Sequence, residues 1–170
     1  MRFCHACREP AVRSGASGHG AERAILRYYC YVHAREAGLL EGRLASLLST
    51  GAATGYATNA VVFVLEALHQ RGCIIARDAE RPVWSLALPV KTEDQFGIAI
   101  RLWAIERFDF HEHLVLKHWK LIRGQDVGTI LLRLAEAGVL ARDGKHVAQV
   151  LKKLLALRRE LLTFPYDEPC

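Results

Sequence analysis

The chain has 170 residues, of which 51% are hydrophobic and 24% charged, a balance that excludes general disorder and permits a packed core of ordinary domain size. Its formal net charge is +5, and the basic excess lies at the two ends, which permits contact with an acidic partner without requiring it. No apolar run is long enough to cross a bilayer, and the first residues lack the apolar stretch of a signal peptide, so we expect a cytoplasmic protein.

The first predicted module, residues 1–37, contains two pairs of metal ligands. Cys4 and Cys7 form a C-x2-C pair, and Cys30 and His33 form a C-x2-H pair. Three thiolates and one imidazole suit tetrahedral zinc, and four protein ligands leave no open position for catalysis. The sequence therefore predicts a small zinc knuckle or ribbon with a structural Zn, in a compartment where thiols stay reduced.

The same residues carry a resemblance. "CHACREPAV" (4–12) and "YYCYVHAREAGLL" (28–40) are similar to the N-terminal zinc segment of the bacterial activator of protein-arginine kinase. The resemblance implies a bacterial protein whose zinc module serves protein–protein contact and is not itself an enzyme. It covers about the first forty residues, and nothing after residue 50 resembles that activator, so kinase activation is not implied.

Residues 38–55 are predicted to form a helix and a linker. Leucines recur at helical spacing from Leu39 to Leu48, and the small residues of "STGAATG" (49–55) then end the helix.

Residues 56–145 are predicted to form a compact helical module, so the fold class is mainly α. A first helix is predicted with Thr58 or Asn59 at its N-cap and Gly72 at its end. Residues 73–90 contain β-branched residues and two prolines, and they are expected to form either one short β-hairpin or an irregular excursion.

Three further helices follow in the same module. Thr92 and Gln95 form a predicted capping box for the next helix. "HEHLVLKHWKLI" (111–122) reads as a helix that ends near Gly124. The next helix has Asp126 as its candidate cap and Gly138 directly after its end.

A second resemblance covers this module. It depends on the segments "NAVVFVLEAL" (59–68), "AIRLWAIERFD" (99–109), "LVLKHWKLI" (114–122) and "DVGTILLRLAEAGVL" (126–140). They resemble, in order and spacing, a small bacterial helical protein family without an assigned activity. The chain departs from that family at "VKTEDQ" (90–95), where a His and a Gly are missing, and at Lys120, which replaces a Gly.

Catalysis is the weakest of three functional hypotheses. His111, His113 and His118 lie close together in the sequence, but their spacing is not that of a helical zinc-protease pair. We expect surface histidines, with His118 partly buried beside Trp119. The aromatic residues are expected to belong to the core: Phe63, Trp84, Phe96, Trp103, Phe108, Phe110 and Trp119.

The last predicted element is a basic amphipathic helix over residues 146–163. Its Lys152, Lys153, Arg158 and Arg159 either form a solvated face or contact an acidic partner, namely RNA, DNA or a protein groove. The preceding "VLARDGKHVAQV" has the look of the wing of a winged helix, with a turn at Asp143-Gly144.

The leading hypothesis is a non-enzymatic zinc-containing adaptor or accessory protein that binds a protein or a macromolecular assembly. A DNA- or RNA-binding regulator is the alternative, and an enzyme using the His111–His118 region is the weaker one.

Overall fold

The computed structural model describes residues 13–17, 25–29, 54–76, 84–87, 92–141 and 145–164. The predicted ligands Cys4, Cys7, Cys30 and His33 and the predicted helix that begins near Leu39 lie outside the described residues.

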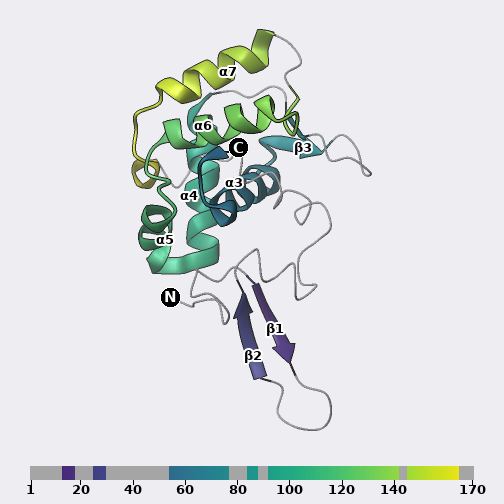
Figure 1. Cartoon of the computed structure of the whole chain (residues 1–170). Coiled ribbons are helices and arrows are strands. Elements are labelled where there is room, and N and C mark those ends of the chain that lie inside the picture. The colour runs from purple at the N-terminus through teal and green to yellow at the C-terminus, as the bar shows by residue number, and fades with distance from the viewer. Residues whose placement is uncertain are drawn as a thin grey trace.

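A β-hairpin lies within the predicted zinc module. Strand β1 (Arg13–Ser17) pairs antiparallel with β2 (Ile25–Tyr29) (Figure 1). Arg13 lies opposite Tyr29 and Ser17 opposite Ile25. The chain therefore enters β1 and leaves β2 at the same end of the hairpin.

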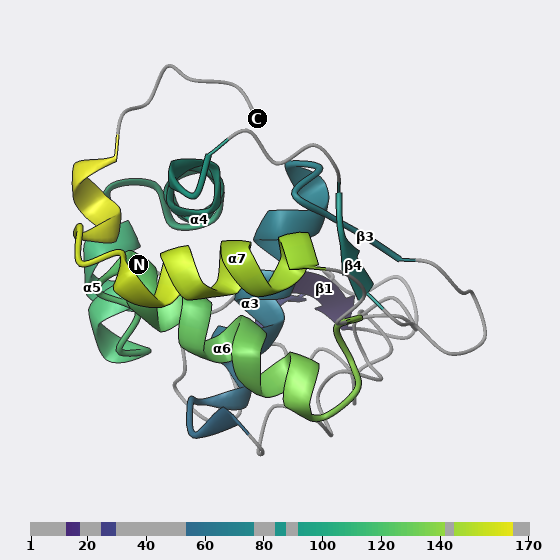
Figure 2. The same cartoon turned by 90° about the horizontal axis from the view of Figure 1, so that it is seen from above.

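Residues 54–164 are mainly helical, as predicted. Their helices are α3 (Thr58–Gln70), α4 (Asp94–Phe108), α5 (Glu112–His118), α6 (Gly124–Glu136) and α7 (Lys145–Ala156). Helix α3 is buried on all its sides from Asn59 to Leu68, which makes it the centre of the core. Helices α6 and α7 lie side by side and form the most extensive helix–helix contact of the described chain (Figures 1 and 2).

The segment after α3 forms a β-hairpin, which is one of the two alternatives predicted for residues 73–90. Strand β3 (Ile74–Ala76) pairs antiparallel with β4 (Trp84–Leu86). The backbone of Trp84 also hydrogen-bonds the segment after α6, because its N–H donates to the Val139 carbonyl and its carbonyl accepts from Ala141. This hairpin therefore ties α3 to the end of α6.

Three helices end in the same backbone motif, in which two amides turn back onto the last helical turn. Gly72 and Gly138 have positive φ angles of 71° and 75° directly after the caps of α3 and α6, which confirms both predicted ends. Lys120 has a φ of 58° after the cap of α5, with Leu121 N–H donating to Leu116 O at 2.8 Å. A lysine therefore occupies a backbone conformation that favours glycine.

The starts of two helices and the end of a third differ from the predictions. Helix α3 begins at Thr58 with Ala57 as its N-cap, so the predicted cap at Thr58 or Asn59 is wrong. Helix α4 begins at Asp94 with Glu93 as its cap, and no side chain caps it, so the predicted Thr92 capping box is wrong. The segment 111–122 does not continue as one helix to Gly124, because α5 ends at His118 and the positive φ of Lys120 turns the chain.

Asp126 stabilises the start of α6 from inside the first turn and not from the cap position. Its carboxylate accepts hydrogen bonds from the backbone N–H groups of Ile122 and Arg123 at 2.8 and 2.7 Å. Its other oxygen accepts the Tyr56 hydroxyl at 3.0 Å. Partial burial and the Asp126 carboxylate together raise the pKa of Tyr56 to about 12. Residues directly before α3 are thereby attached to α6.

The C-terminal helix is shorter than the predicted 146–163. Helix α7 ends at Ala156, and the chain then crosses the start of α6 before a short 3-10 helix, η3 (Leu161–Thr163). The Arg159 and Leu157 carbonyls accept from Gly124 and Gln125, and Leu161 N–H donates to Ile122 O. These bonds satisfy first-turn amides of α6 that a continued α7 would leave without partners.

We call residues 157–164 the crossing segment. Phe164 anchors its end. It is fully buried, and its ring fills the space beside Gly97 of α4, where a Cβ would lie 2.4 Å from a ring carbon. The absence of a side chain at Gly97 is therefore what admits the ring.

A buried carboxylate joins α3 to α4. Glu66 is only 2% exposed, and it accepts from Trp103 Nε1 at 3.2 Å and from Arg107 at 3.4 Å. The Arg107 guanidinium also lies 4.3 Å from the centre of the Trp103 ring. Because a buried charge is tolerated when it is paired and hydrogen-bonded, these contacts fix α4 on the central helix.

Candidate protein-binding surfaces

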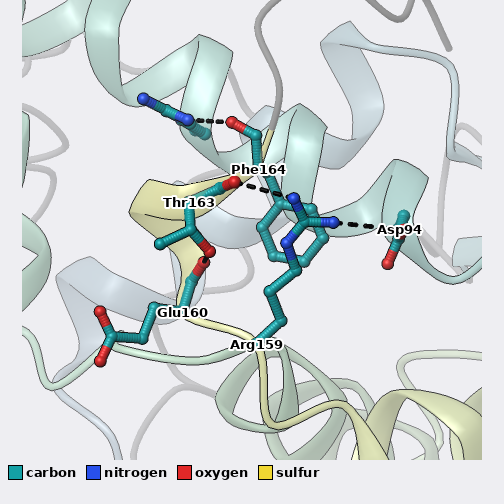
Figure 3. A network of polar contacts seen from close by, with 6 residues as sticks. Asp94, Arg159, Glu160, Thr163 and Phe164 are labelled. Atoms are coloured by element: carbon teal, nitrogen blue, oxygen red, sulfur yellow. Dashed lines mark hydrogen bonds and ion pairs between the residues drawn. The ribbon is translucent and has the colours of Figure 1, made fainter.

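Two of the four predicted basic contact residues have carboxylate partners within the fold. Lys153 Nζ lies 3.4 Å from Glu93 Oε2, and an Arg159 nitrogen lies 3.6 Å from Asp94 Oδ2 (Figure 3). Both carboxylates stand at the start of α4, where negative charge is favoured by the helix dipole. Lys153 and Arg159 therefore hold the C-terminal part of the chain on α4.

Arg159 has further contacts within its own segment. It donates to the Thr163 carbonyl at 2.9 Å, and its guanidinium lies 4.6 Å from the centre of the Phe164 ring (Figure 3). Arg101 of α4 donates to the Phe164 carbonyl. These contacts give Arg159 a structural role.

Lys152 and Arg158 differ from their neighbours, because both are exposed and neither has an ion pair with a described residue. Lys152 lies at the rim of a groove between α6 and α7.

The winged-helix interpretation requires a second wing strand after the turn at Asp143-Gly144. Residues 145–156 form the helix α7 instead of that strand.

The histidine region forms the outer side of α5. His111 ends the 3-10 turn η2 (Asp109–His111), and His113 and His118 of α5 are exposed. The inner side is filled by Trp119, which is 2% exposed and lies 5.3 Å from the Phe63 ring and 5.7 Å from the Phe108 ring, centre to centre. The expectation of a partly buried His118 beside Trp119 is therefore wrong.

Phe110 is the residue that sequence reasoning placed wrongly. It was expected in the core, but it is 84% exposed, and Leu114, four positions later, is 46% exposed. Asp109, with a φ of 53°, ends α4 and turns the chain outward. The signal in the sequence is that Phe110 stands among polar residues in "DFHEH".

A pocket of about 360 Å³ lies between α5 and the crossing segment. It is lined by His113, Leu116, Lys117, Leu121, Ile122, Glu160 and Leu162. Ile122 is also partly exposed. We call Phe110, His113, Leu114, Lys117 and Ile122 the α5 face.

A second hollow lies between α6 and α7. This groove has a volume of about 400 Å³ and is lined by Leu132, Val147, Ala148, Leu151, Lys152 and Leu155. Five of these six side chains are apolar. We call it the α7 groove.

The zinc prediction can be compared only with the backbone of the β1–β2 hairpin. Cys30 follows Tyr29 directly, and Cys7 precedes Arg13 by six positions. Because Arg13 and Tyr29 are paired, the two predicted ligand pairs flank the same end of the hairpin in the sequence. Within residues 54–164, the described parts contain no group of three His, Cys, Asp or Glu side chains that could hold a metal ion.

Comparison with known proteins gives no match: no family model, no curated protein and no solved structure is significantly similar to the chain. Among the described helices, none has the length and apolar character needed to span a membrane.

Proposed function

We propose that this chain is a non-enzymatic, zinc-containing adaptor that binds another protein through the α5 face. The observation that carries the proposal is the exposure of Phe110, 84%, together with that of Leu114, 46%, four positions later. Aromatic side chains are enriched at protein interfaces, where they supply much of the binding energy. A partner that covers this ring would remove from water an apolar surface that the core leaves exposed.

The chemistry of the α5 face favours a protein over a nucleic acid. Phe110, Leu114 and Ile122 of this face are apolar and exposed, and Lys117 is its one residue with a permanent charge, so the face is mainly apolar. Protein interfaces have this composition, whereas nucleic-acid interfaces are dominated by cations that neutralise phosphates.

Zinc is proposed as the structural cofactor of the N-terminal module. Cys4, Cys7, Cys30 and His33 would hold it, and four such donors form a closed site that contributes folding energy and no chemistry. The β1–β2 register supports this assignment, since both ligand pairs flank one end of the hairpin. The module would then present a second rigid surface to a partner.

Nucleic-acid binding remains the alternative, with Lys152 and Arg158 as its exposed cations. It has less support because Lys153 and Arg159 already pair with carboxylates of α4. Binding of this kind should weaken steeply as salt rises.

The test is site-specific crosslinking in lysate of the cells that contain the protein. A photoreactive residue replaces Phe110 in one sample and Gln149, an exposed residue of α7, in the control. We expect a defined protein crosslinked from position 110 only. The affinity of the purified partner should then fall about tenfold or more with Phe110→Ala, which is the effect of losing an interface hot spot.

An affinity for that partner that does not change with Phe110→Ala or Leu114→Ala would refute the role of the α5 face. Retention of the chain on nucleic acid, lost when Lys152 and Arg158 are replaced by Ala and when salt is raised, would favour the alternative.

A further inference from the structure

Helix α7 has two apolar rows: one is buried in the core, and the other has the buried Leu151 at its centre and the exposed Ala148 and Leu155 on either side of it. Val150 and Leu154 are buried in the core. The second row, Ala148, Leu151 and Leu155, lines the α7 groove, and Leu155 remains 38% exposed. The row has the i, i+3, i+7 spacing that recurs on one side of a helix.

Leu132 of α6 and Val147 complete the walls of the groove. The row from Ala148 to Leu155 spans seven residues, or about 10 Å at the rise of an α-helix. A groove of this length and of about 400 Å³ matches two turns of a helix that inserts its own apolar row.

Lys152 is the one charged side chain among the described residues that line the groove. It stands between the apolar residues of the row and has no ion pair with a described residue, whereas its neighbour Lys153 pairs with Glu93. An ammonium group at the rim of an apolar groove is complementary to a carboxylate on the occupant.

We propose that the α7 groove binds an amphipathic helix of a partner protein. That helix carries apolar side chains at i, i+3 or i+4, and i+7, and an acidic side chain that faces Lys152. This is the helix-in-groove mode of recognition. The groove shares no residue with the α5 face, so the two surfaces succeed or fail separately.

The experiment selects peptides from a displayed library of amphipathic helices of about four turns, with the full-length, zinc-loaded chain as bait. Selected peptides are then measured by fluorescence anisotropy. We expect Leu155→Glu and Ala148→Glu each to weaken binding by about tenfold or more. Gln149→Glu is the matched control, because it introduces the same charge at an exposed position of α7 outside the groove.

The charge of Lys152 supplies a second, specific readout. Lys152→Glu should weaken peptides that carry the acidic residue and improve versions in which that residue is Lys. This reversal would not follow from a loss of stability, and it identifies the contact between the two charges.

Three results would overturn the proposal. The first is that no selected peptide depends on Leu155 or Ala148. The second is that Leu44→Asp with Leu48→Asp raises peptide affinity about tenfold, because the groove would then belong to the chain's own predicted N-terminal helix. The third is a dimer in sedimentation that Leu155→Glu dissociates, because the occupant would then be a second copy.

Discussion

The β1–β2 hairpin and the helical module are stabilised by different means. The other elements of the module pack around the buried helix α3. Hydrogen bonds and ion pairs between residues far apart in the sequence connect these elements. The hairpin consists of two five-residue strands, and an isolated two-stranded hairpin is at most marginally stable in water. The comparison teaches that the hairpin needs a stabilising element that the module does not need, and the cysteine pairs that flank it in the sequence are the candidates.

Removal of the proposed zinc should have the largest effect. Structural zinc in small modules contributes about 10–16 kcal/mol of apparent binding free energy, which is also folding free energy. A chelator, or Cys30→Ala, should therefore remove hydrogen-exchange protection from the amides of β1 and β2 and leave that of α3 unchanged. Elemental analysis should give one zinc per chain before chelation and none after. Cys170→Ala is the control and should retain the metal, whereas a protected hairpin in metal-free protein would contradict the proposal.

The next largest effect concerns two phenylalanines that differ in burial. Phe164→Ala should lower the free energy of unfolding of the helical module by about 3–5 kcal/mol, because it leaves a cavity beside Gly97. The same substitution at the exposed Phe110 should change it by less than about 0.5 kcal/mol. Urea denaturation followed by far-UV circular dichroism measures both, and equal losses would contradict the described positions of the two rings.

Lys120→Gly should stabilise the module. The left-handed backbone costs a non-glycine residue about 1–2 kcal/mol, so the gain in unfolding free energy should be about 1 kcal/mol. The matched control is Lys117→Gly, three positions earlier inside α5, which should destabilise by about 1 kcal/mol. If both variants lose stability, the helix does not end as described.

The smallest effect is a dependence on alkaline pH. Because the pKa of Tyr56 is raised from 10.0 to about 12 in the folded chain, the unfolded chain releases this proton first as the pH rises. The contribution of Tyr56 is thus fully present below pH 10 and is lost between pH 10 and about 12. Tyr56→Phe should flatten this part of the curve of unfolding free energy against pH. A slope that persists in the variant would assign it to other groups.

The sequence predicted local features well, because they depend on neighbouring residues. Gly72 and Gly138 identified the ends of α3 and α6, since few other residues accept a positive φ. Ten consecutive buried residues in α3 follow from its apolar composition. Cys73, directly after Gly72, is an apolar residue by type and is buried in the core.

The predictions failed where contacts between residues far apart in the sequence determine where a helix ends or whether a side chain is paired or exposed. The leucines at 154, 157 and 161 keep a helical period, yet α7 ends at Ala156 because the next carbonyls bond the start of α6. A helical wheel of residues 146–163 groups Lys153 with Lys152, but only the fold reveals that Glu93, sixty positions earlier, pairs with Lys153. Phe110 was misplaced for the same reason, since its exposure follows from the turn at Asp109.

The crossing segment also determines when the module can become complete during synthesis. The first backbone N–H groups of α6 donate to the carbonyls of Leu157 and Arg159. Those two residues are synthesised more than thirty residues after the start of α6. The ring of Phe164 must likewise pack against Gly97, which is synthesised much earlier. Such non-local contacts form slowly, so in a nascent chain that stalls before residue 157 the backbone N–H groups of Gly124 and Gln125 lack their partners and the module is incomplete.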